Sequence, residues 1–211
     1  MKEIERINWN NSFINDLLKS DKTPNSIKLL QMKYDVKYPD FSFTNFYNQK
    51  RNTIYHGTTT SFLEELKTSN TIIPTHGYKY NDRIASYKAI TDFIDYHPCH
   101  SLFFGWYACD DDFKFNLSET KTDTVLLKLS IPTEFLIPHG YSEWCNFVYS
   151  MVESNNKPAQ ICSREFNRSV EEMLGAVFNP YFYIQFGIEV FIKELRYDWI
   201  TDIKYTNSII I

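Results

Sequence analysis

The segment Thr53-Ile54-Tyr55-His56-Gly57-Thr58 joins a short apolar strand to the start of a helix. We expect the strand over 53–55 and the helix over 62–69. The helix can be capped by Thr59, Thr60 or Ser61, its first turns contain Glu64 and Glu65, and its apolar face is formed by Phe62, Leu63 and Leu66. Gly57 has no Cβ, so a planar ligand can approach the backbone closely beside His56. For an isolated His-Gly pair, a turn with a structural histidine is the more frequent explanation.

The elements around this segment predict an α+β fold with antiparallel sheets. Helices are expected over 13–18, 27–32, 83–96, 142–153 and 170–176, and strands over 71–73, 101–107, 124–131, 188–192 and 200–205. We interpret residues 1–50 as an N-terminal helical extension packed on a main domain of residues 51–211. The chain has only 6 Gly and no glycine fingerprint for phosphates, which argues against a doubly wound parallel sheet.

The composition narrows the class of protein. The chain has 211 residues and a formal net charge of −4, which argues against a broad basic surface for nucleic acid. Its 4 cysteines form no C-x-x-C pair, which is typical of free thiols in a reducing compartment. No secretory signal or membrane-spanning run is found. We therefore expect a cytoplasmic protein that does not contact a membrane.

Three segments carry a resemblance to a known family. They are Ile54-Tyr55-His56-Gly57-Thr58 with its helix, Ile72-Ile73-Pro74, and Ile188-Glu189-Val190-Phe191-Ile192. In this order they resemble the ADP-ribosyltransferase superfamily, in the branch with a histidine, aromatic and glutamate signature that includes the PARP-like and diphtheria-toxin-like enzymes. The resemblance covers about residues 51–211. It implies a split antiparallel β-sandwich with flanking helices.

The resemblance also implies that NAD is the substrate and assigns roles around it. Glu189 would bind a hydroxyl of the nicotinamide ribose and stabilise the oxocarbenium-like state formed when the bond to nicotinamide breaks. His56 would hold a ribose hydroxyl. The backbone of Gly57 would bind the nicotinamide carboxamide, flanked by Tyr55 and Thr58.

The ring that would stack on nicotinamide falls within the aromatic strand predicted over 101–107 or shortly after it. Phe103 and Tyr107 are the favoured residues, while Trp106 and Phe113 compete for the same role. Any of these side chains can supply a rigid π-face.

The acceptor of ADP-ribose is left open between protein, RNA and DNA. The acidic balance slightly favours protein, although Lys50, Arg51, Lys79 and Arg83 could steer a nucleic acid. The size and composition are similar to those of an intracellular bacterial or phage toxin held by an antitoxin or immunity protein.

Two other functions and one other carboxylate pair compete with this interpretation. Glu171 and Glu172 could imitate the family's glutamate, although their helical setting indicates a solvated face. A metal-dependent hydrolase would use ligands from one short span: His97, Cys99, His100, Cys109 and Asp110 to Asp112. A non-catalytic interaction module of the same fold is the second alternative.

Overall fold

The computed structural model describes residues 24–33, 41–74, 83–96, 101–107, 123–153, 169–180 and 188–205. The strands are β1 Arg51–Thr59, β2 Thr71–Ile72, β3 Phe103–Tyr107, β4 Thr124–Pro132, β5 Leu136–Gly140, β6 Ile188–Ile192, β7 Leu195–Arg196 and β8 Ile200–Tyr205. The helices are α2 Pro24–Lys33, α3 Phe43–Asn48, α4 Thr60–Ser69, α5 Ile84–Phe93, α6 Tyr141–Glu153 and α7 Val170–Val177, with 3-10 turns at Thr133–Phe135 and Tyr197–Trp199.

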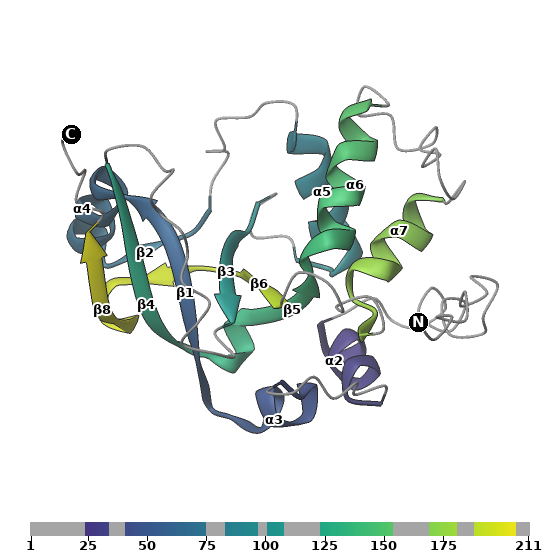
Figure 1. Cartoon of the computed structure of the whole chain (residues 1–211), viewed down its shortest axis with the longest axis horizontal. Helices are drawn as coiled ribbons and strands as arrows, with labels where there is room; N and C mark the ends of the chain where they lie inside the picture. Colours follow the sequence, from purple (N-terminus) through teal and green to yellow (C-terminus); the bar gives the residue numbers. More distant parts are fainter. Residues whose placement is uncertain are drawn as a thin grey trace, which may run out of the picture.

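A six-stranded sheet in the order β5-β6-β3-β1-β4-β8 organises the described chain. Each neighbouring pair in it is antiparallel. β2 and β7 form a separate antiparallel two-stranded sheet. Figure 1 shows helices α5, α6 and α7 gathered at the β5 side of the large sheet, and α4 at the β8 side. The protein is therefore an α+β protein, as its sequence predicts.

Local sequence explains how the helices next to the sheet begin. The side chain of Thr59 accepts a hydrogen bond from the backbone N–H of Phe62 and so caps α4, which ends at Asn70 in the left-handed conformation. At α7 the Ser169 hydroxyl accepts from the Glu172 backbone, while the Glu172 carboxylate accepts from the Ser169 backbone. Both helices therefore start where side chains satisfy their first N–H groups.

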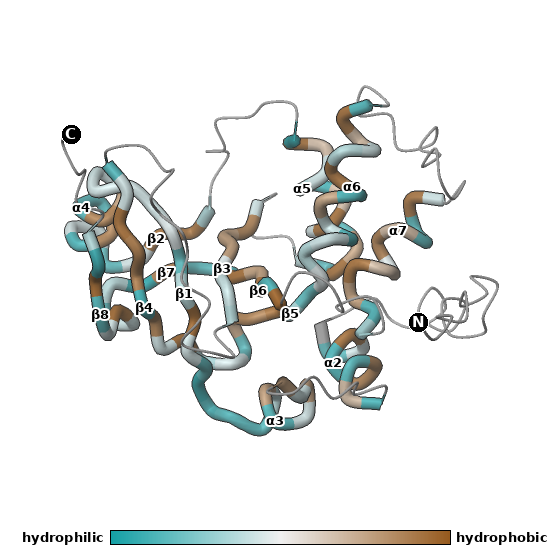
Figure 2. The backbone as a smooth tube through the Cα atoms, viewed as in Figure 1, coloured by the Kyte–Doolittle hydropathy of each residue, from teal (hydrophilic) through white to brown (hydrophobic). Residues whose placement is uncertain are grey.

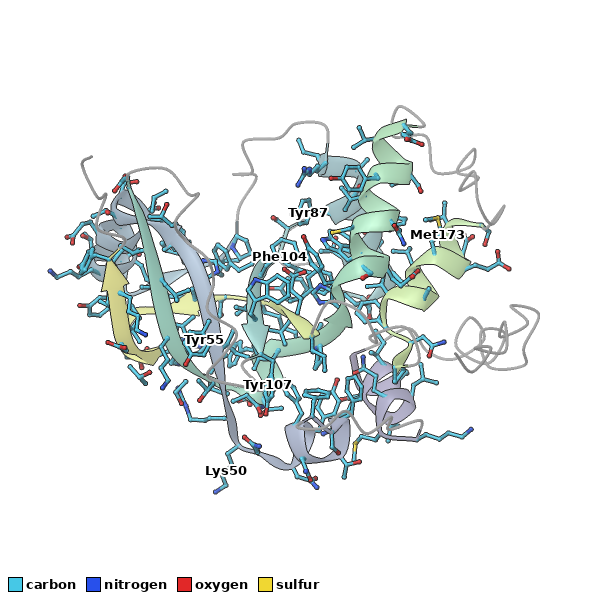
Figure 3. All side chains as sticks on the ribbon, viewed as in Figure 1. Lys50, Tyr55, Tyr87, Phe104, Tyr107 and Met173 are labelled. Atoms are coloured by element: carbon cyan, nitrogen blue, oxygen red, sulfur yellow. The ribbon has the colours of Figure 1, made fainter. Side chains whose placement is uncertain are left out.

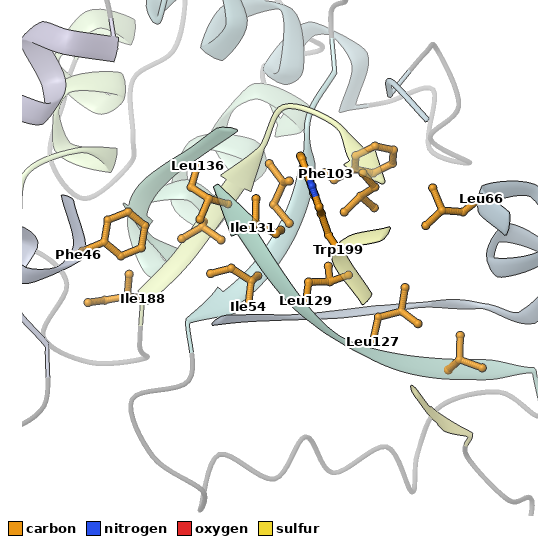
Figure 4. Packing of buried hydrophobic residues seen from close by; sticks show 14 of the residues in the cluster. Phe46, Ile54, Leu66, Phe103, Leu127, Leu129, Ile131, Leu136, Ile188 and Trp199 are labelled. Atoms are coloured by element: carbon orange, nitrogen blue, oxygen red, sulfur yellow. The ribbon is translucent and has the colours of Figure 1, made fainter. Parts of the chain in front are cut away.

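Strand alternation gives the sheet two faces of different character. We call one the aliphatic face, because it carries Ile54, Leu127, Leu129, Val190 and Ile192, all completely buried. Figure 4 shows several of these side chains packed together with residues from α3 and α4. In Figure 2, β4 correspondingly alternates between apolar and polar residues along its length.

The other face, which we call the aromatic face, is covered by α5, α6 and the end of α7. Phe104 of β3 meets the ring of Tyr87 at 5.6 Å between centroids, and Phe191 of β6 meets Trp144 at 5.3 Å and Phe178 at 6.2 Å. Further along this face, over β4 and β8, the residues turn polar. The two faces therefore bury two separate clusters.

The sheet splits between its central strands. β1 pairs with β4 along its whole length, but among the described residues it pairs with β3 only through Ile54–Tyr107 and Tyr55–Trp106. Beyond Tyr55 the two strands are joined by a side chain, because the Nδ1 of His56 lies 2.5 Å from the carbonyl oxygen of Phe104. The segment that follows Tyr55 therefore lies at a discontinuity of the sheet.

Within the described residues, most elements expected from the sequence are confirmed, with shifted ends. The helix expected over 13–18 lies outside the described residues. The strands over 188–192 and 200–205 match their predicted bounds, and β1 is longer than the strand expected over 53–55. Three elements were not anticipated: α3, β5 and β7. The last two predicted strands also do not pair, because β6 lies between β3 and β5 while β8 pairs with β4. In the part of the chain that the structure describes, no helix combines the length and apolar character needed to span a membrane.

Candidate active site

A row of side chains crosses the whole sheet at one level. The register aligns, from β8 to β5, the residues Asp202, Lys128, Tyr55, Trp106, Glu189 and His139. Residues opposite one another in neighbouring strands project to the same face, so this row lies on the aromatic face. The row brings together chemistry from segments that are distant in the sequence.

Glu189 and His139 form a buried polar pair within that row. The Nε2 of His139 lies 2.9 Å from the Oε2 of Glu189, and the two side chains are 0% and 8% exposed. The imidazole stacks on Phe191 with centroids 3.6 Å apart and planes 10° apart. Buried carboxylates are rare unless they are paired, so this contact accounts for how Glu189 is tolerated in the interior.

Glu189 opens into a cleft between the aromatic face and helices α5 and α6. The cleft has a volume of about 380 Å³ and is lined by Arg83, Tyr87, Phe104, Tyr141, Trp144, Cys145, Val148, Tyr149 and Glu189. Glu189 is the carboxylate in this lining. The Oε1 of Glu189 makes no hydrogen bond within the described residues. A cleft with aromatic walls and one carboxylate suits a ligand that combines a planar ring with hydroxyl groups.

Tyr141 and Cys145 form the α6 side of this cleft. A hydrogen bond with Cys145, with burial and the nearby Glu189 adding to it, raises the pKa of Tyr141 to about 12. Burial raises the pKa of the Cys145 thiol, an effect that the bond to Tyr141 opposes. Both groups therefore hold their protons at neutral pH, so Cys145 is a poor nucleophile here.

Trp106 is the aromatic residue of β3 that accompanies Glu189. It lies opposite Glu189 in the register, and its ring centroid is 5.0 Å from that of Tyr141. Phe104 lines the cleft on the same strand face. The aromatic contribution to this site therefore comes from the even-numbered residues of β3.

No family model, curated protein or solved structure matches this chain. The site must therefore be interpreted from its own geometry.

His56 projects to the aliphatic face, opposite to Glu189. Its ring packs against Phe62 and Phe103, with centroids 6.3 and 5.9 Å away, and it is 8% exposed. Burial lowers the pKa of His56, partly offset by the bond to the Phe104 carbonyl. An unprotonated ring donating from Nδ1 satisfies this environment, so His56 ties β1 to β3 at the split. The two side chains expected to bind ribose hydroxyls of NAD thus project to opposite faces of the sheet.

Gly57 and Tyr55 lie on the same face as Glu189. Gly57 is exposed, and a Cβ placed there would meet no atom within 4 Å among the residues that the structure describes. Tyr55 is half-buried beside the Nζ of Lys128, which lies 5.9 Å from its ring centroid. Thr58 projects to the His56 side. Among the described residues the Cβ position of Gly57 is therefore open, and ligand binding at its backbone stays a prediction.

The choice of Phe103 and Tyr107 as the stacking rings is corrected by the strand alternation. Phe103 is buried in the aliphatic cluster against His56. Tyr107 packs on Phe41 and Phe46, with centroids 5.1 and 5.4 Å away. Figure 3 shows Phe104 near Tyr87, and Tyr107 at the other end of β3. Both favoured rings therefore project away from the face that carries Glu189.

Sequence reasoning missed His139, Tyr141 and Cys145 entirely. One signal for them existed: His139-Gly140 is a second histidine-glycine pair, placed directly before the helix predicted from 142. It was overlooked because β5 itself was not predicted.

The residues of the alternative interpretations lie partly within the described segments and partly outside them. Glu171 is exposed, as expected for a solvated helix face, whereas Glu172 is half-buried and completes the capping box of α7 with Ser169. The metal-ligand candidates His97, Cys99, His100, Cys109 and 110–112, with Phe113 and Lys79, lie outside the described residues. Within the described ranges, no group of three or more His, Cys, Asp or Glu side chains could hold a metal ion.

Proposed function

We propose that the protein is an ADP-ribosyltransferase, which breaks the bond between nicotinamide and ribose in NAD and transfers ADP-ribose to a macromolecular acceptor. The observation that carries this proposal is that β3 lies between β1 and β6 in the sheet. The aromatic strand thus separates Tyr55 and Gly57 from Glu189, and all three strands contribute to one face. In the sequence, the resemblance likewise takes the stacking ring from the strand that stands between His56-Gly57 and Glu189 along the chain.

In this proposal Glu189 is the catalytic residue. Its Oε2 is held by His139, which leaves Oε1 to accept a hydrogen bond from a hydroxyl of the nicotinamide ribose. A carboxylate fixed beside that sugar stabilises the positive charge that develops on it as nicotinamide leaves. The low polarity of the surrounding rings strengthens this interaction.

The aromatic walls and Gly57 would position the substrate. The backbone of Gly57 can approach the carboxamide because none of the described residues occupies the position of its missing Cβ. Trp106 replaces Phe103 and Tyr107 as the preferred stacking ring, because it stands next to Glu189 in the register. His56 fixes the separation of β1 and β3 through its hydrogen bond to the Phe104 carbonyl. Its contact with a ribose hydroxyl stays a prediction.

A labelling experiment tests this function. Purified protein is incubated with NAD labelled on the adenylate phosphate, together with a bacterial cell extract, and protein, RNA and DNA fractions are then separated and counted. We expect label in one fraction, which identifies the acceptor class. Glu189→Gln should lower the rate by roughly two to four orders of magnitude.

The control is Glu172→Gln, because Glu172 lies in the α7 cap and does not line the cleft. It should retain the rate of the unmodified protein. Absence of label in every fraction, together with absence of NAD binding by calorimetry, would refute the proposed function. Equal losses in the two variants would remove Glu189 from the catalytic role.

A further inference from the structure

The partner of Glu189 is a histidine with very little freedom. His139 is completely buried on β5, directly opposite Glu189 in the register. Phe191 stacks on one side of its ring at 3.6 Å, and Phe104 and Trp144 meet it at 6.3 and 6.4 Å with nearly perpendicular planes. These contacts fix both the position and the orientation of the imidazole.

The hydrogen bonding of His139 indicates which nitrogen carries the hydrogen. Nε2 lies 2.9 Å from the Glu189 carboxylate, whereas Nδ1 is buried and has no hydrogen-bond partner among the described residues. An ionised carboxylate only accepts, so Nε2 must donate to it. A hydrogen on Nδ1 would be a buried donor without an acceptor, which is the more costly arrangement. The geometry thus favours the tautomer with hydrogen on Nε2.

A purely stabilising role explains this pair poorly. Replacing a buried polar pair by apolar residues of similar volume is often neutral or stabilising, because both groups lose their hydration on folding. Here the pair is placed inside a cluster of aromatic rings and at the edge of a cleft. His139 holds one carboxylate oxygen, and the other makes no hydrogen bond to a described residue. Such a contact fixes the orientation of the carboxylate.

We propose that His139 is a positioning residue for Glu189, with its Nε2–H held on Oε2 so that Oε1 is directed to the substrate hydroxyl in the cleft. The inference rests on the proposed function, since it gives His139 a part in the same reaction. His139 touches no reacting atom. Its effect is to keep the carboxylate in the orientation that stabilises the transition state, so it acts on kcat more than on KM.

Two substitutions at His139 test its hydrogen-bond donor and its aromatic ring independently. His139→Phe keeps an aromatic ring on Phe191 but removes the donor, whereas the amide nitrogen of His139→Gln can reach the position of Nε2. We expect kcat for NAD cleavage to fall about 10- to 100-fold in His139→Phe, with KM changed less than about threefold. We expect His139→Gln to recover most of kcat. An unchanged kcat in His139→Phe, or an equal loss in both variants, overturns the proposal.

A measurement that does not need activity keeps this inference separate from the proposed function. In protein labelled with ¹⁵N at histidine, two-bond correlations show which ring nitrogen carries hydrogen. We expect His139 to carry it on Nε2, and the Nε2 resonance to move in Glu189→Gln but not in the control Glu172→Gln. A hydrogen on Nδ1, or an Nε2 resonance that does not move in Glu189→Gln, overturns the inference. An inactive protein that still shows the expected spectrum would refute the transferase function and leave the contact established.

Discussion

The two faces of the six-stranded sheet bury very different side chains, although they are made from the same strands. The aliphatic face packs residues such as Ile54, Leu129 and Val190, and its buried histidine, His56, bonds to a backbone carbonyl. The aromatic face buries Glu189 against His139 among rings. Burying an ionisable pair is expensive, whereas burying aliphatic groups is favourable. The aliphatic face therefore stabilises the fold, whereas the aromatic face also carries the residues of the candidate active site.

Removing the ring beneath His139 should have the largest effect on stability. Phe191 is completely buried and contacts His139, Phe104, Trp144 and Phe178. Phe191→Ala should lower the free energy of unfolding by about 3–5 kcal/mol, measured by urea denaturation. Phe191→Leu fills more of the space and should lose less. Equal losses would mean that the volume under His139 does not matter for stability.

The next prediction compares one glycine from each face. A Cβ at Gly105 would overlap the side chain of Ile54 and lie 2.9 Å from the Cδ1 of Ile192, whereas at Gly57 it would meet no atom of the described segments within 4 Å. Gly105→Ala should therefore cost about 1–3 kcal/mol of stability, while Gly57→Ala should change stability little.

NAD binding to Gly57→Ala tests the functional role of the aromatic face. If NAD lies against the backbone of Gly57, calorimetry should show weaker binding to Gly57→Ala without loss of stability. A strongly destabilised Gly57→Ala would contradict the open space on the aromatic face.

His56 should make stability depend on pH. Burial lowers its pKa from the ordinary 6.5, so as the pH falls below that value the unfolded chain binds a proton before the folded chain does. The free energy of unfolding should then fall, by at most about 1.4 kcal/mol per pH unit, until the folded ring is also protonated. Urea denaturation between pH 8 and 5.5 measures this slope.

His56→Asn is the control, because its amide can still donate to the Phe104 carbonyl but does not titrate. Its stability should depend less on pH over that range. Identical slopes in the two proteins would show that other groups cause the dependence.

The smallest predicted effect lies outside both faces. Ser169→Ala removes the capping side chain of α7 and should cost about 1 kcal/mol of stability, seen as a lower urea midpoint. The rate of NAD cleavage should stay the same, because the cap does not line the cleft. A lower rate would show that α7 is coupled to the aromatic face.

Local patterns made much of the fold predictable. The alternation of β4 and the threonines before α4 act over a few residues, so the sequence identified both elements and their approximate ends. β5 was missed because Leu136-Ile137-Pro138-His139-Gly140 contains proline and glycine and does not alternate. It is nevertheless an edge strand whose residues are all buried. Its burial depends on distant partners that a local window does not contain: Leu136 and Ile137 join the two core clusters, and Gln31 donates a hydrogen bond to the Pro138 carbonyl from 107 positions away.

By itself the sequence determined the α+β class, the strand that carries His56-Gly57, and Glu189 at the start of β6. Only the tertiary structure decided that His56 and Glu189 lie on opposite faces, that Trp106 rather than Phe103 accompanies Glu189, and that His139 holds the carboxylate. The physical reason is register. A shift of one residue between paired strands reverses every side chain, and the His139–Glu189 contact joins residues 50 positions apart. Periodicity within a strand fixes which residues share a face, but the pairing of distant strands fixes what those residues meet.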